Sequence, residues 1–304
     1  MRSTTQPSSI SGHFPGCASK IPRDRTVVRR SVLVMNLKLM PMLRPLLAVL
    51  AIGSLLTSVS AQTVDTGFLN RSVRVDGVEY RFQVYVPRGF TRSVRWPIIL
   101  ALHGGEAYGN DGIRQTEVGL ARAVRLHAER FPSIIVFPQS PADRTPGWQG
   151  LGGDAALAAL DRAVTEFNGD RSRLYLTGLS AGGNGTWSLA ARYPDRFAAL
   201  IVVAGWISEL QSTTTGVLYP AIAPGAGDPF AAVAQRVSKL PIWIFHGEID
   251  PRVPVEESRK MAAALKALSA DVRYTEFAGV GHNAWDSAYG SADVFEWLFR
   301  QKRK

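Results

Sequence analysis

One stretch decides the fold of this chain: LYLTGLSAGG, at residues 174–183. Residues 174–177 have strand-forming character, the Gly-x-Ser-x-Gly pattern follows at once, and residues 186–192 then read as a helix. A serine on so tight a strand-to-helix turn has strained backbone angles, and side chains at 178 and 182 would collide with neighbouring backbone. The stretch therefore predicts that Ser180 is a nucleophile held open at the end of a strand.

Short apolar runs alternate with amphipathic stretches on both sides of this turn. The apolar runs cover residues 98–102, 134–137, 174–177, 198–203, 242–245 and 272–277, and the amphipathic stretches cover residues 117–130, 155–167, 186–192, 255–268 and 292–301. This alternation predicts an α/β fold with a mostly parallel sheet and helices on both faces. Residues 73–75 and 80–86 flank Asp76-Gly77 and predict an N-terminal antiparallel hairpin, and residues 206–228 predict a surface loop.

The first sixty residues have the pattern of an export signal. Residues 46–56 are an apolar run with Lys38 and Arg44 before it and Val-Ser-Ala at residues 59–61 after it. The run is shorter than the roughly 20 residues that span a bilayer, so we expect no stable membrane span. The expected organisation is a leader at residues 1–61, cleaved near Ala61, and one catalytic domain at residues 62–304, secreted or periplasmic.

Two features of the leader leave alternatives open. The polar segment before Met35 is long for a signal peptide, so Met35 and Met40 are alternative starts. Arg29-Arg30 resembles a twin-arginine export signal, and the alternative is a pair of arginines in a disordered tail.

Charge and cysteine content narrow the function classes. The leader carries eight basic residues and one acidic residue, so its removal lowers the formal charge from +10 to +3. With no basic cluster before the C-terminal tail, we expect no nucleic-acid partner. The single cysteine, Cys17, lies in the leader, so the predicted mature chain has no disulfide and no thiolate ligand. We expect neither a metal nor a cofactor.

A serine nucleophile needs a base, and the chain offers five histidines. We expect His13 in the leader, His127 in a helix, His103 as a loop anchor and His246 at a packing position, which leaves His282 on a late loop. For the acid, the loop after residues 242–245 offers Asp250, with Glu248 as the alternative. The order Ser180, Asp250, His282 is typical of α/β-hydrolases.

The tetrahedral intermediate needs amide donors beside the nucleophile. The first predicted donor is the amide of Ala181, which opens the helix after Ser180. The second is the amide of Gly105, in the His-Gly-Gly turn that follows the strand at residues 98–102. Trp148 and Trp285 are candidate substrate contacts, and core packing is the alternative for both.

Four blocks carry a family resemblance. They are LHGGE at residues 102–106, TGLSAGG at residues 177–183, HGEID at residues 246–250 and Gly281-His282. With them the chain resembles α/β-hydrolase esterases of the predicted-peptidase, polyhydroxybutyrate depolymerase and feruloyl esterase grouping, which are similar to the prolyl oligopeptidase catalytic domain. It departs from that pattern at Glu106, where glycine or cysteine is usual, and we count Glu106 among the substrate contacts. It also lacks the cysteines usual in extracellular depolymerases.

The sequence therefore predicts a serine hydrolase that cleaves a small-molecule or oligomeric carboxylic ester through an acyl-enzyme on Ser180. The alternatives are a peptidase similar to prolyl oligopeptidase and a non-catalytic binding protein on a hydrolase scaffold. The resemblance disfavours the peptidase. Relatives of the prolyl oligopeptidase type gate their substrates with a propeller domain, and we expect residues 62–304 to form the catalytic domain alone.

Overall fold

The computed structural model describes residues 65–141, 147–212, 216–222, 225 and 227–303. All of them belong to one compact unit, Gln62–Lys304. The predicted leader, its cleavage site near Ala61, the alternative starts and Cys17 lie outside the described residues.

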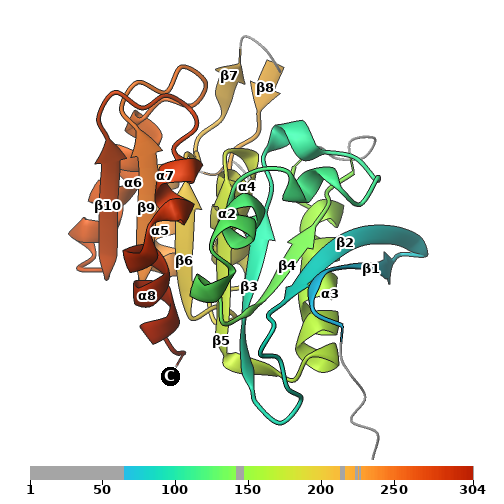
Figure 1. The fold of residues 1–304 in the computed structure, drawn as a ribbon. Helices are drawn as coiled ribbons and strands as arrows, with labels where there is room; N and C mark the ends of the chain where they lie inside the picture. The colour runs from blue at the N-terminus through green and yellow to red at the C-terminus, as the bar shows by residue number, and fades with distance from the viewer. Residues whose placement is uncertain (1–64, 142–146, 213–215, 223–224, 226, 304) are drawn as a thin grey trace, which may run out of the picture. The chain divides into compact units, whose positions relative to one another are not determined.

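The core of this unit is one eight-stranded sheet in the order β1-β2-β4-β3-β5-β6-β9-β10 (Figure 1). Its strands are β1 (Gly67–Val75), β2 (Val78–Val86), β3 (Trp96–Leu102), β4 (Ile134–Pro138), β5 (Gly169–Leu179), β6 (Ala199–Val203), β9 (Ile242–Gly247) and β10 (Val272–Phe277). β1 and β2 pair antiparallel, β2 pairs antiparallel with β4, and all the other pairs are parallel. Asp76 and Gly77 have φ angles of 49° and 77°, as the predicted hairpin turn requires.

Helices cover both faces of the sheet, and each face has its own apolar cluster. One cluster includes residues of α3 (Leu151–Glu166), α4 (Ala181–Arg192), α5 (Pro229–Val237) and α6 (Glu256–Ala267). The other includes residues of α2 (Leu120–Leu126), α7 (Trp285–Gly290) and α8 (Ala292–Arg300). Residues 98–100 and 200–202 are fully buried, as expected of central parallel strands. The predicted α/β-hydrolase architecture is confirmed.

Some element boundaries differ from the predicted ones. The amphipathic stretch at residues 117–130 forms a helix only at Leu120–Leu126, because Gly119 with φ 66° precedes it and a separate 3₁₀ turn, Ala128–Arg130, follows. The predicted loop at residues 206–228 contains a small hairpin of β7 (Leu210–Ser212) and β8 (Gly216–Leu218). Helix α5, which the periodicity did not reveal, begins with Asp228 capping the amide of Phe230 and with proline at its first position.

The sheet brings the predicted catalytic residues to one edge. β5, β6, β9 and β10 are parallel neighbours, and Ser180, Asp250 and His282 lie just beyond the carboxyl ends of β5, β9 and β10. In α/β sheets ligands bind at this edge. No helix in the described part of the chain is long and apolar enough to span a membrane.

Candidate active site

Ser180 occupies the sharp turn between β5 and α4. Its φ of 54° and ψ of −117° are strained for a residue with a side chain. A Cβ atom on Gly178 would lie 2.1 Å from the carbonyl oxygen of Gly182, and a Cβ atom on Gly182 would lie 2.1 Å from that of Leu102. The two flanking glycines are thus required because backbone approaches them too closely for any side chain. The turn leaves Ser180 partly exposed.

His282 lies between Ser180 and Asp250. Its Nε2 atom is 2.9 Å from the Ser180 Oγ atom, and its Nδ1 atom is 2.7 Å from the Asp250 Oδ2 atom. Because an ionised carboxylate only accepts hydrogen bonds, Nδ1 carries a proton, and in the neutral ring Nε2 is free to accept the hydroxyl proton of Ser180. Asp250 is fully buried, whereas the His282 side chain retains 11% exposure. The Asp250 carboxylate is shielded from water while the imidazole of His282 remains accessible.

The Asp250 carboxylate has donors at both oxygens. Oδ1 accepts the amides of Arg252 and Val253 at 2.8 and 3.0 Å, and Oδ2 faces His282 Nδ1 and His246 Nε2, the latter at 3.2 Å. Burial by itself would raise the pKa of Asp250, but hydrogen bonds from His246, His282 and the Val253 amide outweigh it and hold that pKa well below its ordinary value. Asp250 is therefore an anion across the neutral pH range.

Glu248, the alternative acid, lies in the same loop but has a different partner. Its Oε2 atom accepts the amide of Gly279 at 2.8 Å, on the loop that precedes His282. Of the two carboxylates only Asp250 contacts the imidazole.

The two predicted oxyanion donors lie on either side of Ser180. A Cβ atom on Gly104 would be 3.6 Å from the Cβ atom of Ser180, so the turn that carries Gly105 packs directly against the serine. Ala181 is the first residue of α4, where backbone amides have no intrahelical acceptor. Within the described residues neither the Gly105 amide nor the Ala181 amide makes a hydrogen bond. Both are available for an anionic oxygen.

His103 anchors the turn that carries Gly105. Its Nδ1 atom is 2.7 Å from the carbonyl oxygen of Gly104, and its Nε2 atom accepts the amide of Ser140 at 3.0 Å. In this tautomer Nδ1 is the donor. The Gly104 carbonyl and the Gly105 amide belong to one planar peptide unit, so the His103 hydrogen bond also orients the amide. Burial lowers the pKa of His103 to about 4, and the ring is neutral at neutral pH.

Trp148 occupies a core position, which was the alternative to substrate contact for this residue. Its side chain is fully buried. The indole Nε1 donates to the carbonyl of His103 at 3.2 Å, and the rings of Trp148 and His103 pack edge to face. Gly185 on α4 leaves room for this ring, since a Cβ atom there would lie 2.4 Å from the Trp148 Cβ. Trp148 supports the oxyanion turn from behind.

The other two predicted substrate contacts reach the surface. The Glu106 side chain is 85% exposed and pairs with Arg252, Nη1 to Oε1 at 2.7 Å, so that the oxyanion turn and the Asp250 loop are joined. Trp285 is half-buried and packs edge to face on the His282 ring, with centroids 5.2 Å apart. Both residues lie near Ser180, Asp250 or His282. Contact of either with a substrate stays a prediction.

A polar network beside Ser180 was missing from the sequence analysis. The amide of Asn184 donates to the Ser180 carbonyl at 3.0 Å, and its side chain bonds Gln149 and the carbonyl of Trp206. The indole of Trp206 in turn donates to the Tyr219 carbonyl at 2.8 Å. This network fastens the segment after β6 to the nucleophile helix. No motif reveals it, because its members are brought together by the packing of three separate segments.

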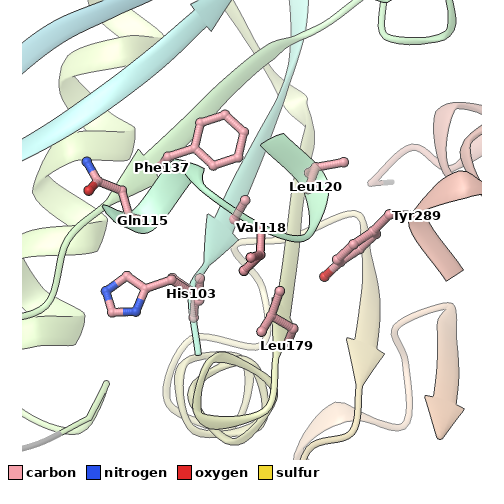
Figure 2. A pocket seen from close by; sticks show the side chains of 9 residues that line it. His103, Gln115, Val118, Leu120, Phe137, Leu179 and Tyr289 are labelled. Carbon is pink, nitrogen blue, oxygen red and sulfur yellow. The ribbon is translucent and has the colours of Figure 1, made fainter. Parts of the chain in front are cut away.

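A small cavity lies near the end of β3, and its lining includes neither Ser180 nor Gly105. Figure 2 shows His103, Gln115, Leu179 and Tyr289 around it. At about 10 Å³ it holds no more than one water molecule and cannot accept an acyl group. Elsewhere in the described residues, no three His, Cys, Asp or Glu side chains are placed to hold a metal ion.

Comparison with known proteins places this geometry in a family context. Residues 153–303 match the prolyl oligopeptidase family. The chain is 27% identical over 230 residues to the probable feruloyl esterase C of Aspergillus terreus, covering 73% of this chain and 75% of that protein. It is 31% identical over 134 residues to acetylxylan esterase A of Emericella nidulans, covering 41% of each.

A solved structure gives the same result. The crystal structure of a thermostable esterase superposes with a TM-score of 0.64 at 29% identity, covering 78% of this chain and 63% of that one. The predicted resemblance is confirmed: the chain has the α/β-hydrolase fold and is similar to the prolyl oligopeptidase family over residues 153–303 and to these esterases over a larger part of its length.

Proposed function

We propose that this enzyme hydrolyses carboxylic esters through a covalent acyl-enzyme on Ser180. The observation that carries the proposal is the position of His282, with Nε2 2.9 Å from the Ser180 hydroxyl and Nδ1 2.7 Å from Asp250. A serine is a weak nucleophile unless a base within hydrogen-bond reach takes its proton. The related proteins named as esterases support an ester bond as the target.

The chemistry follows from these contacts. His282 Nε2 takes the Ser180 proton as Oγ attacks the ester carbonyl carbon, and the amides of Gly105 and Ala181 stabilise the oxyanion. The carbon–oxygen bond to the alcohol then breaks, and the alcohol leaves with the proton held by His282. Water, deprotonated by His282, attacks the acyl carbon and releases the acid and Ser180. Asp250 stabilises the imidazolium form throughout.

The proposed substrate is a small-molecule or oligomeric ester with a feruloyl or short acyl group. Two relatives, named feruloyl esterase and acetylxylan esterase, favour this class. Trp285 beside His282 is the aromatic surface on which an aromatic acyl group would pack. The exposed pair of Glu106 and Arg252 lies at the same site and gives it a polar rim.

A peptidase is the second candidate, since residues 153–303 match the prolyl oligopeptidase family. An amide is the harder substrate, because its leaving amine must be protonated as the bond breaks. A binding protein that uses the same pocket without turnover is a third reading, which an activated Ser180 would contradict.

We also propose that residues 1–61 are a leader and that the catalytic domain, residues 62–304, is exported after cleavage near Ala61. One relative, from Arthroderma benhamiae, is named as a secreted protein, which supports export. N-terminal sequencing of the protein recovered from the producing cells tests the cleavage site. A mature chain that begins at Met35 or Met40 would contradict it.

The deciding experiment is intact-mass measurement after reaction with a fluorophosphonate probe. We expect one adduct on the wild type and none on Ser180→Ala. A panel of p-nitrophenyl esters, methyl ferulate and dipeptide amides then identifies the substrate class. Ser180→Ala and His282→Ala should each lower kcat by about 10⁶. Absence of an adduct at neutral pH would favour the binding protein, and equal turnover of amides and esters would favour the peptidase.

A further inference from the structure

His246 is a fully buried histidine behind the catalytic acid. It lies at the end of β9, and its Nε2 atom is 3.2 Å from the Asp250 Oδ2 atom and 3.1 Å from the Val253 carbonyl oxygen. Its Nδ1 atom is 2.7 Å from the hydroxyl of Ser258, on the first turn of α6. Ser258 is itself buried. Both ring nitrogens therefore have partners, and one of them is the carboxylate that holds His282.

The partners determine which nitrogen of His246 carries the proton. Nε2 faces a carboxylate and a carbonyl, both of which only accept hydrogen bonds, so Nε2 must be a donor. Nδ1 faces the Ser258 hydroxyl, which can donate. The neutral ring is satisfied in one arrangement: Ser258 donates to Nδ1, and Nε2–H donates toward Asp250 and Val253.

The contact of His246 with Asp250 bears on the orientation of the Asp250 carboxylate. Oδ2 accepts a hydrogen bond from His282 and lies 3.2 Å from Nε2 of His246, while Oδ1 accepts two backbone amides. Both oxygens of the carboxylate therefore accept hydrogen bonds. Rotation of the carboxylate would break at least one of them in the buried interior, where an unpaired polar group costs free energy. Without His246 the Oδ2 atom would have His282 as its one donor, so less would oppose rotation of the Asp250 carboxylate away from His282.

We propose that His246, held by Ser258, is a positioning residue that keeps Asp250 oriented toward His282. The inference rests on the proposed serine hydrolase function and extends its hydrogen-bonded chain inward, from Ser180 through His282, Asp250 and His246 to Ser258. The alternative is that His246 only fills space in the core. A filler would affect stability alone, whereas a positioning residue affects the turnover of the folded enzyme and depends on the Nε2 donor.

Two substitutions of His246 separate these roles. His246→Gln places an amide nitrogen near the position of Nε2 and keeps the donor to Asp250, whereas His246→Leu removes it at similar size. Ser258→Ala removes the hydroxyl that holds the ring. The matched control is Thr177→Val, which removes another buried hydroxyl, one bonded to Tyr289 rather than to the catalytic chain.

Kinetics on the folded fraction, counted by fluorophosphonate titration, give the first readout. We expect His246→Leu to lower kcat about 10- to 100-fold with KM changed less than about threefold, the size of losing a hydrogen bond to a charged group. His246→Gln should recover kcat to within about fivefold of the wild type. Ser258→Ala should lower kcat by a smaller factor, and Thr177→Val should retain it. A folded His246→Leu with wild-type kcat, or a folded His246→Gln as slow as His246→Leu, would overturn the proposal.

Proton NMR gives a second readout that does not need turnover. The short hydrogen bond between His282 Nδ1 and Asp250 should give a far-downfield resonance in the wild type and in His246→Gln, and it should shift or broaden in His246→Leu or Ser258→Ala. An unchanged resonance in all variants would contradict the positioning role. Failure of the wild type to react with the fluorophosphonate would instead refute the proposed function, while the NMR comparison would still decide the role of His246.

Discussion

The Nδ1 atom of His282 lies 2.7 Å from Oδ2 of Asp250, although Glu248 occupies the same loop two residues earlier. Glu248 instead accepts the amide of Gly279 at 2.8 Å and braces the loop that leads to the histidine. Asp250 and Glu248 therefore have different partners: Asp250 contacts the imidazole, and Glu248 holds the backbone of the loop before it. Asp250 is buried against the imidazole, and Glu248 is exposed.

This difference predicts opposite results for two alanine substitutions. Asp250→Ala should lower kcat by about 10⁴, because the imidazolium formed in the reaction loses its counter-ion and the ring loses its orientation. Glu248→Ala, the matched control in the same loop, should change kcat less than about threefold. Initial rates on a p-nitrophenyl ester measure both. A fast Asp250→Ala together with an inactive Glu248→Ala would identify Glu248 as the acid.

Stability should fall as the pH drops from about 6.5 to about 4, because His103 is buried in its neutral form. Burial lowers the pKa of His103 to about 4 in the folded state, against about 6.5 in an unfolded chain. Between these pH values only the unfolded chain binds the proton. The free energy of unfolding that neutral His103 contributes is therefore full above pH 6.5, and it is lost by the time the pH has fallen to about 4. Its upper size is about 3 kcal/mol.

His103→Asn tests this linkage, since asparagine cannot be protonated and its amide nitrogen can still donate to the Gly104 carbonyl. Urea unfolding at several pH values between 4 and 7 gives the free energy of unfolding of both proteins. We expect the wild type to lose more stability than the variant on acidification, so that the gap between them narrows. Parallel curves would show that His103 does not titrate in this range.

The turn that carries Ser180 could be predicted because most of its determinants are local. A strand, a Gly-x-Ser-x-Gly pattern and a helix are contiguous, and the steric need for Gly178 follows from the tightness of the turn, whereas the need for Gly182 comes from the Leu102 carbonyl at the end of β3. The alternation of strands and helices likewise sets the topology, because parallel strands need a crossover between them.

The sequence analysis left alternatives open or was silent where the packing of the folded chain decides the outcome. The sequence pattern of an aromatic residue after a glycine does not distinguish a pocket residue from a core residue. Trp148 is buried, and Gly185, in another segment, leaves room for its ring. His246 was assigned to packing because the sequence does not show how the loop after β9 folds back and brings Asp250 within 3.2 Å of it. The network around Asn184 likewise joins segments far apart in the chain.

The segment after β6 should depend on a single buried acid. Glu257 on α6 accepts the amides of Ile207 and Ser208 at 2.8 and 3.0 Å and the Ser208 hydroxyl at 2.6 Å. Glu257→Ala leaves both amides without an acceptor and should cost about 2–4 kcal/mol of unfolding free energy. Glu257→Gln should cost much less, because its carbonyl can accept both amides while the Ser208 hydroxyl turns to accept from its nitrogen.

The neighbouring Glu256 is the control, because it is exposed and, among the described residues, forms an ion pair with Arg259 alone. Glu256→Ala should cost less than about 1 kcal/mol, as is usual for a surface ion pair. Urea unfolding curves measure all three variants. Equal costs for Glu256→Ala and Glu257→Ala would mean that the segment is held by other contacts.

Gly182→Ala should be among the most damaging single-methyl changes in the protein. The added Cβ atom would lie 2.1 Å from the carbonyl oxygen of Leu102 and 2.7 Å from that of His103. The end of β3 cannot move aside freely, because its residues pair with β5 as far as Leu102. We expect a loss of more than about 3 kcal/mol in unfolding free energy, or failure to fold.

Any Gly182→Ala protein that does fold should also be slow, because the clash can be relieved only by moving α4 away from the turn that carries Gly105. The two oxyanion donors would then separate, and kcat should fall by about 10²–10³ while KM changes little. Gly89→Ala is the control, since a Cβ atom there meets nothing within 4 Å. Its stability should stay within about 0.5 kcal/mol of the wild type. A stable, fully active Gly182→Ala would show that α4 and the oxyanion turn tolerate separation, which would argue against Ala181 and Gly105 acting as a fixed pair.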